Sequence, residues 1–248
     1  MSKYSFVKSS VLIQYSVAEQ IFVLEVALSN CSIFPGQFFL LKNWDQNLPL
    51  MRPISVFKTF EHSVQFLYKV IGQGTAKLAQ LQEGDAIELL GPLGNGFPCH
   101  DVKGKIALLG GGIGIPPLYE TAKKLTLLGN EVSLFLGYRD KTFCIDDFAE
   151  VSHQLFIASE SGLEGYQGFI TELLHPEAFD AVLTCGPEIM MKTVRKMCLA
   201  AKVPVWLSME KRMGCGIGAC LVCNCETTGG MKRCCTDGPI FNGNDLIF

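Results

Sequence analysis

The residues most clearly suited to chemistry are six cysteines crowded between positions 215 and 235. The first three, Cys215, Cys220 and Cys223, form a Cys-x4-Cys-x2-Cys run, which is the spacing of plant-type [2Fe–2S] loops and requires one more distant cysteine as the fourth ligand. Three glycines lie in or beside this run: Gly214, Gly216 and Gly218. Because glycine lacks a Cβ, such a loop can wrap closely around an inorganic core and direct backbone N–H groups at its sulfurs. The run therefore predicts an iron–sulfur centre that carries electrons.

Two other interpretations of the cysteines remain open. A structural zinc site also uses Cys-x2-Cys, but it usually combines two short knuckles, and no second knuckle or nearby histidine follows here. A disulfide framework is expected in small secreted chains, whereas 248 residues can build a core without covalent cross-links. The cysteines remote from the run are expected to be ordinary buried thiols: Cys31, Cys99, Cys144 and Cys198.

Composition excludes several classes of function. The chain is 48% hydrophobic and 18% charged, which is typical of a globular protein with room for two domains and a small appendage. Its net charge of -3 gives no electrostatic reason to bind nucleic acid or an anionic membrane. We find no apolar stretch of the ~18 residues that a membrane span needs. The first residues lack the pattern of a secretory signal, so a cytoplasmic location is expected.

Two further units must position the cysteine run. Residues 1–99 contain short β-rich runs separated by turn residues, which predicts a small antiparallel barrel. These runs are residues 11–13, 21–28, 37–41, 54–57, 64–71 and 86–90. A helix is expected from Gly74 and Thr75 to about residue 82.

From about residue 103 the pattern changes to buried strands alternating with helices, which predicts a parallel sheet covered on both faces. The expected strands are residues 106–109, 132–138, 154–158, 181–184 and 205–209, and the expected helices are residues 117–128 and 188–202.

The glycine-rich turn from Gly110 through Gly112 and Gly114 to Pro116 stands between a strand and a helix, the context in which a dinucleotide pyrophosphate binds. It does not match G-x-G-x-x-G, because Ile115 occupies the last position of the motif. No acidic residue closes the second strand; Tyr138, Arg139 and Asp140 stand there instead. A purely structural tight turn remains an alternative.

Several of these segments together resemble a known family. Arg52-Pro53-Ile54-Ser55, Gly74-Thr75, the turn at 110–116 and Cys185-Gly186-Pro187 ahead of Met190-Met191 resemble the flavin-dependent ferredoxin reductase superfamily. Residues 208–220, followed by residues 235–241, narrow the resemblance to the electron-transfer subunits of dihydroorotate dehydrogenase type B. The resemblance implies a multidomain β plus α/β fold: an antiparallel FAD-binding β-barrel at residues 1–99, a parallel-sheet NAD-binding α/β domain at 103–209 and a small C-terminal [2Fe–2S] domain at 210–248.

The resemblance also implies flavin contacts. Arg52 would neutralise the FAD pyrophosphate, for which its planar guanidinium is well suited, and Ser55 would bond near the reactive edge of the ring. A surface salt bridge is the alternative for Arg52, and Ile54 replaces the stacking aromatic residue that is common in the family. The remaining implied contacts are Pro53, Leu67, Tyr68, Lys69, Gly74 and Thr75. Tyr68 could equally be a core residue of its strand. Two phosphate elements favour FAD over FMN.

In the nucleotide domain the resemblance assigns NAD-binding positions. These are Gly110, Gly112, Gly114, Cys185, Gly186 and Pro187. Cys185 follows a buried strand and is a candidate wall of the nicotinamide site, with a structural thiol as the alternative. Met190 and Met191 are expected to pack in their helix. NAD and NADP stay undistinguished, because Arg139 could contact a 2′-phosphate or lie on the surface.

The fourth iron ligand is ambiguous because Cys234 and Cys235 are adjacent. The family's Cys-x-Asp-Gly-Pro motif selects Cys235, so the implied metal ligands are Cys215, Cys220, Cys223 and Cys235. Cys225 and Cys234 would then be spare.

The implied activity is electron transfer in pyrimidine biosynthesis. A partner subunit carrying FMN would oxidise dihydroorotate to orotate, and electrons would pass through the [2Fe–2S] cluster and FAD to NAD+. The cofactors would carry the chemistry while the protein positions and tunes them. The expected assembly is a heterotetramer of two plus two subunits. One alternative is an NAD(P)H-dependent reductase subunit that serves another partner, such as a sulfur reductase, hydrogenase or oxygenase. Another is an iron–sulfur redox sensor without turnover.

Overall fold

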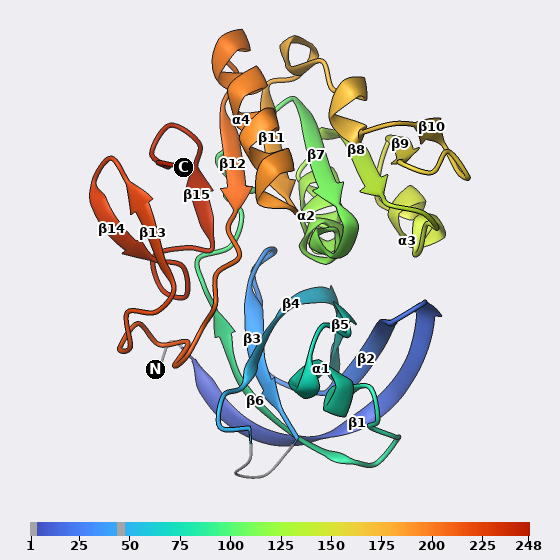
Figure 1. The fold of residues 1–248 in the computed structure, drawn as a ribbon, viewed down its shortest axis with the longest axis vertical. Coiled ribbons are helices and arrows are strands. Elements are labelled where there is room, and N and C mark those ends of the chain that lie inside the picture. The colour runs from blue at the N-terminus through green and yellow to red at the C-terminus, as the bar shows by residue number, and fades with distance from the viewer. Residues whose placement is uncertain (1–3, 44–47) are drawn as a thin grey trace.

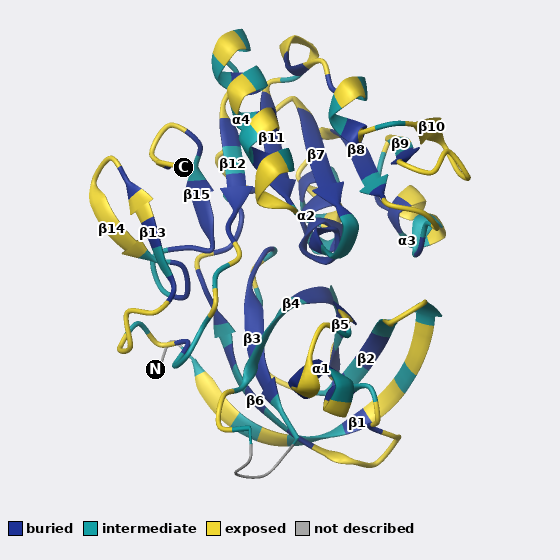
Figure 2. Cartoon of the chain, viewed as in Figure 1, coloured by how far each residue is buried: buried dark blue, intermediate teal, exposed yellow. Residues whose placement is uncertain are grey.

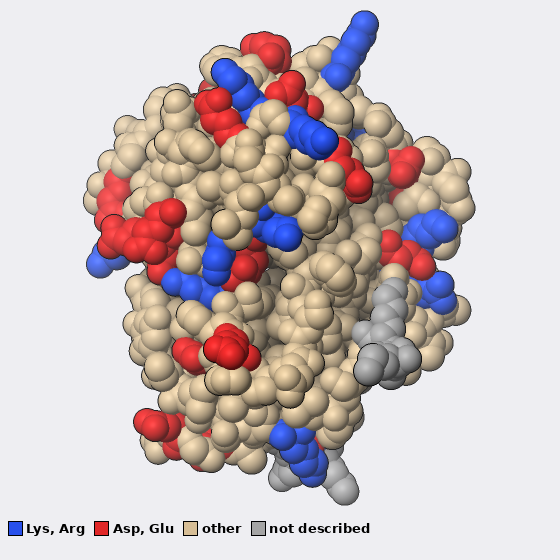
Figure 3. Space-filling view, turned by 180° about the vertical axis from the view of Figure 1, so that it is seen from behind, with Lys and Arg blue, Asp and Glu red and all other residues tan. Residues whose placement is uncertain are grey.

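A lower β-barrel and an upper α/β unit, with a small C-terminal segment beside both, make up the molecule (Figure 1). The computed structural model describes residues 4–43 and 48–248. Among these residues, no helix is both long and apolar enough to cross a bilayer. On the face opposite to that of Figure 1, acidic and basic side chains are interspersed among uncharged surface, as the small net charge suggests (Figure 3).

The barrel is closed by six antiparallel strands in the order β1-β2-β5-β4-β3-β6. Their bounds are β1 Ser5–Ala18, β2 Ile21–Ala27, β3 Phe38–Lys42, β4 Arg52–Thr59, β5 Ser63–Lys69 and β6 Ala86–Leu93. Inward-facing residues such as Leu24, Phe39 and Phe66 fill its core. The antiparallel barrel is therefore confirmed, but β1 is much longer than the predicted residues 11–13. Most residues of β1 are only partly buried or exposed (Figure 2). A prediction based on a run of apolar residues therefore found only the middle of this strand. The short helix α1 (Gln73–Leu78) follows β5.

The α/β unit is a seven-stranded sheet in the order β10-β9-β8-β7-β11-β12-β15. Its strands are β7 Lys105–Gly111, β8 Glu131–Tyr138, β9 Gln154–Ser159, β10 Tyr166–Gln167, β11 Ala181–Cys185, β12 Val205–Ser208 and β15 Ile240–Asn242, and its helices are α2 Pro116–Leu127, α3 Ile145–Glu150 and α4 Glu188–Ala201. Single 3-10 turns occupy Gly112–Gly114, Ile170–Leu173 and Pro176–Ala178.

Alternation along β7 shows that both faces of this sheet are covered. Ile106 and Leu108 pack in the core that contains Leu118 of α2, whereas Ala107 and Leu109 pack in the core that contains Val194 of α4. The parallel sheet is confirmed for β7 to β12. The last strand, β15, pairs antiparallel with β12 and comes from the range predicted for a third domain. That segment also contains the hairpin of β13 (Asn224–Thr227) and β14 (Gly230–Arg233).

The barrel and the sheet unit are packed together along β4 and α2. The ring centroids of Phe57 and Tyr119 are 5.3 Å apart, and the backbone N–H of Thr59 donates to Glu120 Oε1 at 2.7 Å. Lys58 forms an ion pair with Asp147 of α3. These contacts fix how the two units face each other.

Candidate functional site

The cysteine run folds into a loop that brings its first two thiols together. The backbone N–H groups of Ala219 and Cys220 donate to Cys215 Sγ at 3.3 and 3.4 Å, and the N–H of Cys215 donates to Cys220 Sγ at 3.4 Å. Burial raises the pKa of Cys215, but the backbone N–H donors outweigh it and lower this pKa to about 7. A thiol held in such a ring of N–H donors is prepared to bind metal as a thiolate.

The other two predicted ligands form a second pair. Burial and a hydrogen bond with the Cys223 thiol raise the pKa of Cys235 to about 12, which places these two sulfurs in contact. The backbone N–H of Gly218, in the middle of the loop, also bonds to Cys235. The loop and the turn at 233–238 thus bring two thiol pairs, Cys215 with Cys220 and Cys223 with Cys235, close to one another.

The adjacent Cys234 points elsewhere. Its thiol donates to the carbonyl oxygen of Met209 at 2.9 Å, and it also bonds to Cys225, which lowers the pKa of Cys225. Cys225 and Cys234 therefore form a buried thiol pair of their own. This geometry supports Cys235 as the fourth ligand.

The donor set fits a two-iron cluster. In the described part of the chain, no three His, Cys, Asp or Glu side chains converge on one point as ligands of a single metal ion. A [2Fe–2S] cluster with four cysteine ligands instead takes two thiolates on each iron, and two separate thiol pairs match that demand. Thr236 Oγ1, buried beside the loop, has no protein hydrogen-bond partner among the described residues, so a polar group remains available there.

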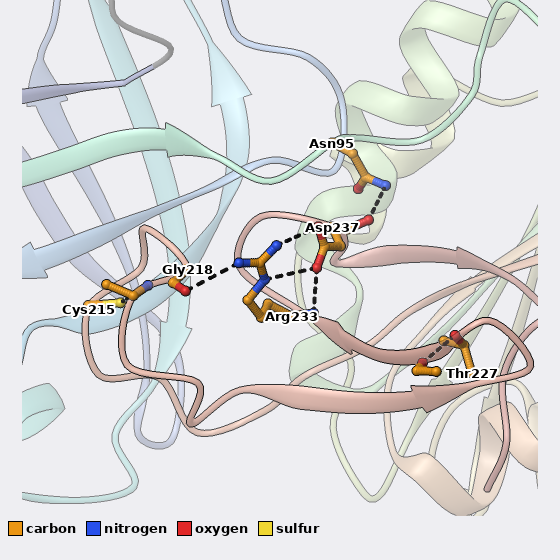
Figure 4. A network of polar contacts seen from close by, with 8 residues as sticks. Asn95, Cys215, Gly218, Thr227, Arg233 and Asp237 are labelled. Atoms are coloured by element: carbon orange, nitrogen blue, oxygen red, sulfur yellow. Dashed lines mark hydrogen bonds and ion pairs between the residues drawn. The ribbon is translucent and has the colours of Figure 1, made fainter.

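A polar network supports the loop from behind (Figure 4). The Arg233 guanidinium bonds Asp237, with Nε 3.1 Å from Oδ2, and reaches the carbonyl oxygen of Gly218 at 3.5 Å. Asn95, just beyond β6, donates to the carbonyl oxygens of Asp237 and Ile240 at 3.2 and 2.8 Å. The barrel, the loop and the turn are therefore held as one unit. Gly218 adopts φ +81°, a left-handed conformation that glycine allows at little cost.

A candidate phosphate site lies on the barrel where Arg52 of β4 packs against Gly74 of α1. A Cβ built on Gly74 would lie 2.4 Å from Arg52 Nε, so only glycine lets the guanidinium approach this backbone. Thr75 Oγ1 accepts from the backbone N–H groups of Ile71 and Gly72 at 2.9 and 3.2 Å, which orders the turn. An arginine held against a glycine turn fits a pyrophosphate through paired charge-assisted bonds. The half-buried Pro53, Ile54 and Ser55 follow Arg52 on β4.

The other predicted flavin contacts on β5 lie in different environments. Tyr68 is only 2% exposed inside the barrel core, stacks on Phe22 at 6.0 Å and donates to Gln14 Oε1 at 3.3 Å. The structure thus favours the core interpretation for Tyr68. Leu67 is buried on the side of the barrel that faces the α/β unit, and Lys69 is exposed.

A cavity of about 280 Å³ opens at the carboxyl edge of the sheet, between the glycine turn and the segment that follows β11. A Cβ on Gly114 would lie 2.4 Å from Gly186 Cα, so the two backbones are in direct contact. The predicted residues Gly112, Gly114, Gly186 and Pro187 line this cavity. Gly110 instead lies beneath the turn, where a Cβ would collide with Ile115 and Leu118.

Cys185 ends β11 within this edge and is 1% exposed. It lies in register with Gly110 and Ser208 on the neighbouring strands, and burial, followed by the nearby Glu210 carboxylate, raises its pKa although Ser208 bonds to the thiol. The position of Cys185 is consistent with the predicted wall of the nicotinamide site. Its burial is equally consistent with the alternative, a structural thiol.

Sequence reasoning missed Glu210 and two methionines that line the cavity. Glu210 lines the cavity and remains exposed to solvent, while desolvation by the neighbouring protein raises the pKa of its carboxyl. Met209 and Met191 also line the cavity, and Met191 packs in the core beneath α4. The position of Glu210, two residues after the last parallel strand, was the one available indication, because that edge binds ligands in α/β proteins.

Comparison with known proteins matches both the C-terminal segment and the whole chain. Residues 210–247 match the family model described as the iron-sulfur cluster binding domain of dihydroorotate dehydrogenase B. The chain is 46% identical over 213 residues to the dihydroorotate dehydrogenase B (NAD(+)) electron transfer subunit of Clostridium acetobutylicum, covering 86% of each chain. It is 43% identical over 245 residues to the subunit of the same name from Clostridium perfringens, covering 98% of each.

Solved structures agree on the architecture. A structure of an NADH-dependent reduced ferredoxin-NADP oxidoreductase superposes with a TM-score of 0.86 at 30% identity, over 96% of this chain and 89% of that chain. A ferredoxin NADP+ reductase from Neisseria gonorrhoeae, solved with FAD and NADP, superposes with a TM-score of 0.66 at 21% identity, over 81% of this chain and 92% of that one. The second likeness concerns the fold alone.

Proposed function

The chain belongs to the family of electron-transfer subunits of dihydroorotate dehydrogenase B, and on this premise we propose that it takes electrons from a catalytic partner subunit and delivers them to NAD+. The observation that supports the proposal is the meeting, in one chain, of two thiol pairs, an arginine held against a glycine turn on the barrel and a cavity at the carboxyl edge of the sheet. The chain is thus an oxidoreductase subunit, while dihydroorotate is oxidised in the partner.

Cys215, Cys220, Cys223 and Cys235 would hold a [2Fe–2S] cluster, which supplies one-electron transfer when bound. The protein's own contribution is visible around Cys215, where the N–H groups of Ala219 and Cys220 point at its sulfur. Such donors stabilise negative charge on the ligand sulfurs.

Arg52, Ser55, Gly74 and Thr75 would hold FAD, which when bound converts between one-electron and two-electron transfer. Arg52 would neutralise the pyrophosphate, and its position against the Gly74 backbone supports this role. Ser55, half-buried three residues along β4, supplies a hydroxyl on the same strand.

The turn at 112–114 and the corner at 185–187 would bind NAD+. Because their backbones touch at Gly114 and Gly186, a dinucleotide would meet both segments at one surface. The carboxyl edge of the sheet, which these segments form, is where α/β folds bind such ligands.

Docking of the partner is proposed at the cysteine loop. Cys220 is exposed, and around it Ile217, Leu221 and Val222 present apolar side chains that are 39%, 60% and 58% exposed. Leu221 adopts φ +56°, which is uncommon for leucine and holds its side chain at the surface. Exposed apolar clusters mark interaction sites. We propose that the occupant is the catalytic subunit, that it carries FMN, and that the assembly contains two copies of each subunit.

Coexpression with a candidate FMN subunit tests the proposal. The purified complex is expected to reduce NAD+ when dihydroorotate is added, and Leu221→Asp is expected to abolish complex formation while leaving NADH-dependent bleaching of the flavin unchanged. Leu127→Asp, at a 75% exposed leucine of α2, is the matched control. Absence of coupling, with every cofactor present in both subunits, would refute the assigned reaction.

A second candidate function is an NAD(P)H-dependent reductase subunit for a different partner, and the 30% identity with the ferredoxin-NADP oxidoreductase supports it. It would use the same candidate phosphate site and cavity. Copurification of a native partner distinguishes the two functions, because only the catalytic subunit of dihydroorotate oxidation would bring a dihydroorotate-dependent activity.

A further inference from the structure

Arg233, the last residue of β14, joins the two segments that carry the proposed iron ligands (Figure 4). Its guanidinium donates two hydrogen bonds to the Asp237 carboxylate, from Nε to Oδ2 at 3.1 Å and from Nη2 to Oδ1 at 3.4 Å. Its backbone closes the same turn: the N–H donates to Asp237 Oδ2 at 2.7 Å, and the carbonyl accepts from the Asp237 N–H at 2.8 Å. Cys235 is held at the centre of this closed turn.

On its other side the guanidinium reaches the cysteine loop. Arg233 Nη1 lies 3.5 Å from the carbonyl oxygen of Gly218. That carbonyl belongs to the same peptide group as the N–H of Ala219, which donates to Cys215 Sγ at 3.3 Å. Because a peptide group is planar, holding its oxygen also sets the direction of its N–H. A cation on the oxygen further polarises the group and strengthens the N–H bond to sulfur.

The charge of Arg233 lies beside the turn that carries Cys235, two residues further along the chain. The paired contacts with the Asp237 carboxylate partly compensate this charge.

We propose that Arg233 is a positioning residue that raises the reduction potential of the [2Fe–2S] cluster, acting through the 218–219 peptide and through its charge, and that Asp237 limits this effect. Nearby positive charge and hydrogen bonds to the ligand sulfurs favour the reduced, more negative cluster. The inference rests on the ligand set of the proposed function.

The test is an EPR-monitored redox titration of the cluster in the purified holoprotein. Arg233→Gln is expected to lower the equilibrium constant for reduction about tenfold, a shift of ~59 mV for one electron. Arg233→Lys, which keeps the charge but loses the planar fork, is expected to lie between Arg233→Gln and the unsubstituted protein. Asp237→Asn is expected to shift the potential in the opposite direction, by about threefold, or ~30 mV. A merely structural role would not produce opposite shifts.

Lys232→Gln is the matched control, since it removes the same charge from the neighbouring residue of β14, which has no hydrogen bond to Gly218 among those found in the described chain. Iron content separates cluster loss from a shift in potential. If Asp237→Asn loses the cluster, the difference between Arg233→Gln and Arg233→Lys decides. Equal potentials for Arg233→Gln and the unsubstituted protein overturn the inference, whereas an unsubstituted protein that reconstitutes without a [2Fe–2S] spectrum overturns the ligand set itself.

Discussion

Replacing Gly114 by alanine tests whether the glycine turn and the β11 corner form one nucleotide site. The added Cβ would lie 2.4 Å from Gly186 Cα, 2.7 Å from Gly186 N and 2.8 Å from the carbonyl carbon of Cys185. All three neighbours are backbone atoms, which cannot turn aside as a side chain can. Since carbon atoms prefer separations of ~3.5–4.0 Å, one segment must move by about 1 Å.

Overpacking of this kind costs about 1–3 kcal/mol of unfolding free energy. For a protein of this size each kcal/mol lowers Tm by roughly 2–4 °C, so the loss is ~2–12 °C. Because the displaced segments both line the cavity, the affinity for NADH is expected to fall at least about tenfold, or ~1.4 kcal/mol.

Circular dichroism melting and saturation of NADH-dependent flavin bleaching measure the two effects on the purified holoprotein. Gly229→Ala is the control: its backbone is not left-handed, and the nearest atom to its Cβ, Thr227 Oγ1, is 3.8 Å away. It is expected to change neither quantity. A Gly114→Ala protein with unchanged Tm and unchanged NADH affinity would show that the backbones of Gly114 and Gly186 are not in direct contact.

Three other substitutions test separate parts of the site. Cys235→Ser is expected to abolish the [2Fe–2S] absorption while Cys234→Ser keeps it, with flavin retained in both; the reverse result would reassign the fourth ligand. Arg52→Met is expected to weaken FAD binding by about ten- to a hundredfold, because a charge-assisted contact of ~1.5–3 kcal/mol is lost, and flavin fluorescence titration of the apoprotein measures it. The pKa of Glu210 is raised, so its ionised form opposes folding above the unfolded value of 4.5. Glu210→Gln should therefore raise Tm at pH 7, and this gain should disappear as the pH falls below 4.5; a gain that persists in acid would contradict the sign.

The order of units along the chain was predictable because their patterns are local. The unbroken apolar strand β7 and the helices α2 and α4 carry clear local patterns, and their observed bounds differ from the predicted ones by at most two residues. The helix α3 was missed, since a helix of six residues presents little periodicity. Strand β15 was missed because three residues become a strand only through pairing with the distant β12.

The candidate site was predictable where spacing alone defines it. Three cysteines of the loop follow from their separations, but the choice between Cys234 and Cys235 depends on the turn closed by Arg233 and Asp237, which sends adjacent side chains in opposite directions. Charged residues such as Arg233 are common on surfaces, so its contacts with Gly218 and Asp237 in the structure are what distinguish it. For Tyr68 the sequence left a ligand contact and a core position equally open, and its burial favours the core.

Because β15 pairs with β12 of the large sheet, the last 39 residues cannot easily be transferred to another protein as an independent domain. Ile240 and Phe241, directly after the cysteine turn, are buried against the α/β unit, and Asn95 ties the same turn to the barrel. A graft of residues 210–248 onto another reductase would leave β15 without its neighbour and the turn without its anchor. Removing these residues here would uncover β12 as an exposed sheet edge, which invites aggregation. A transfer of the cysteine segment to another protein therefore has to include the surfaces on which it packs, namely β12 and the barrel segment around Asn95.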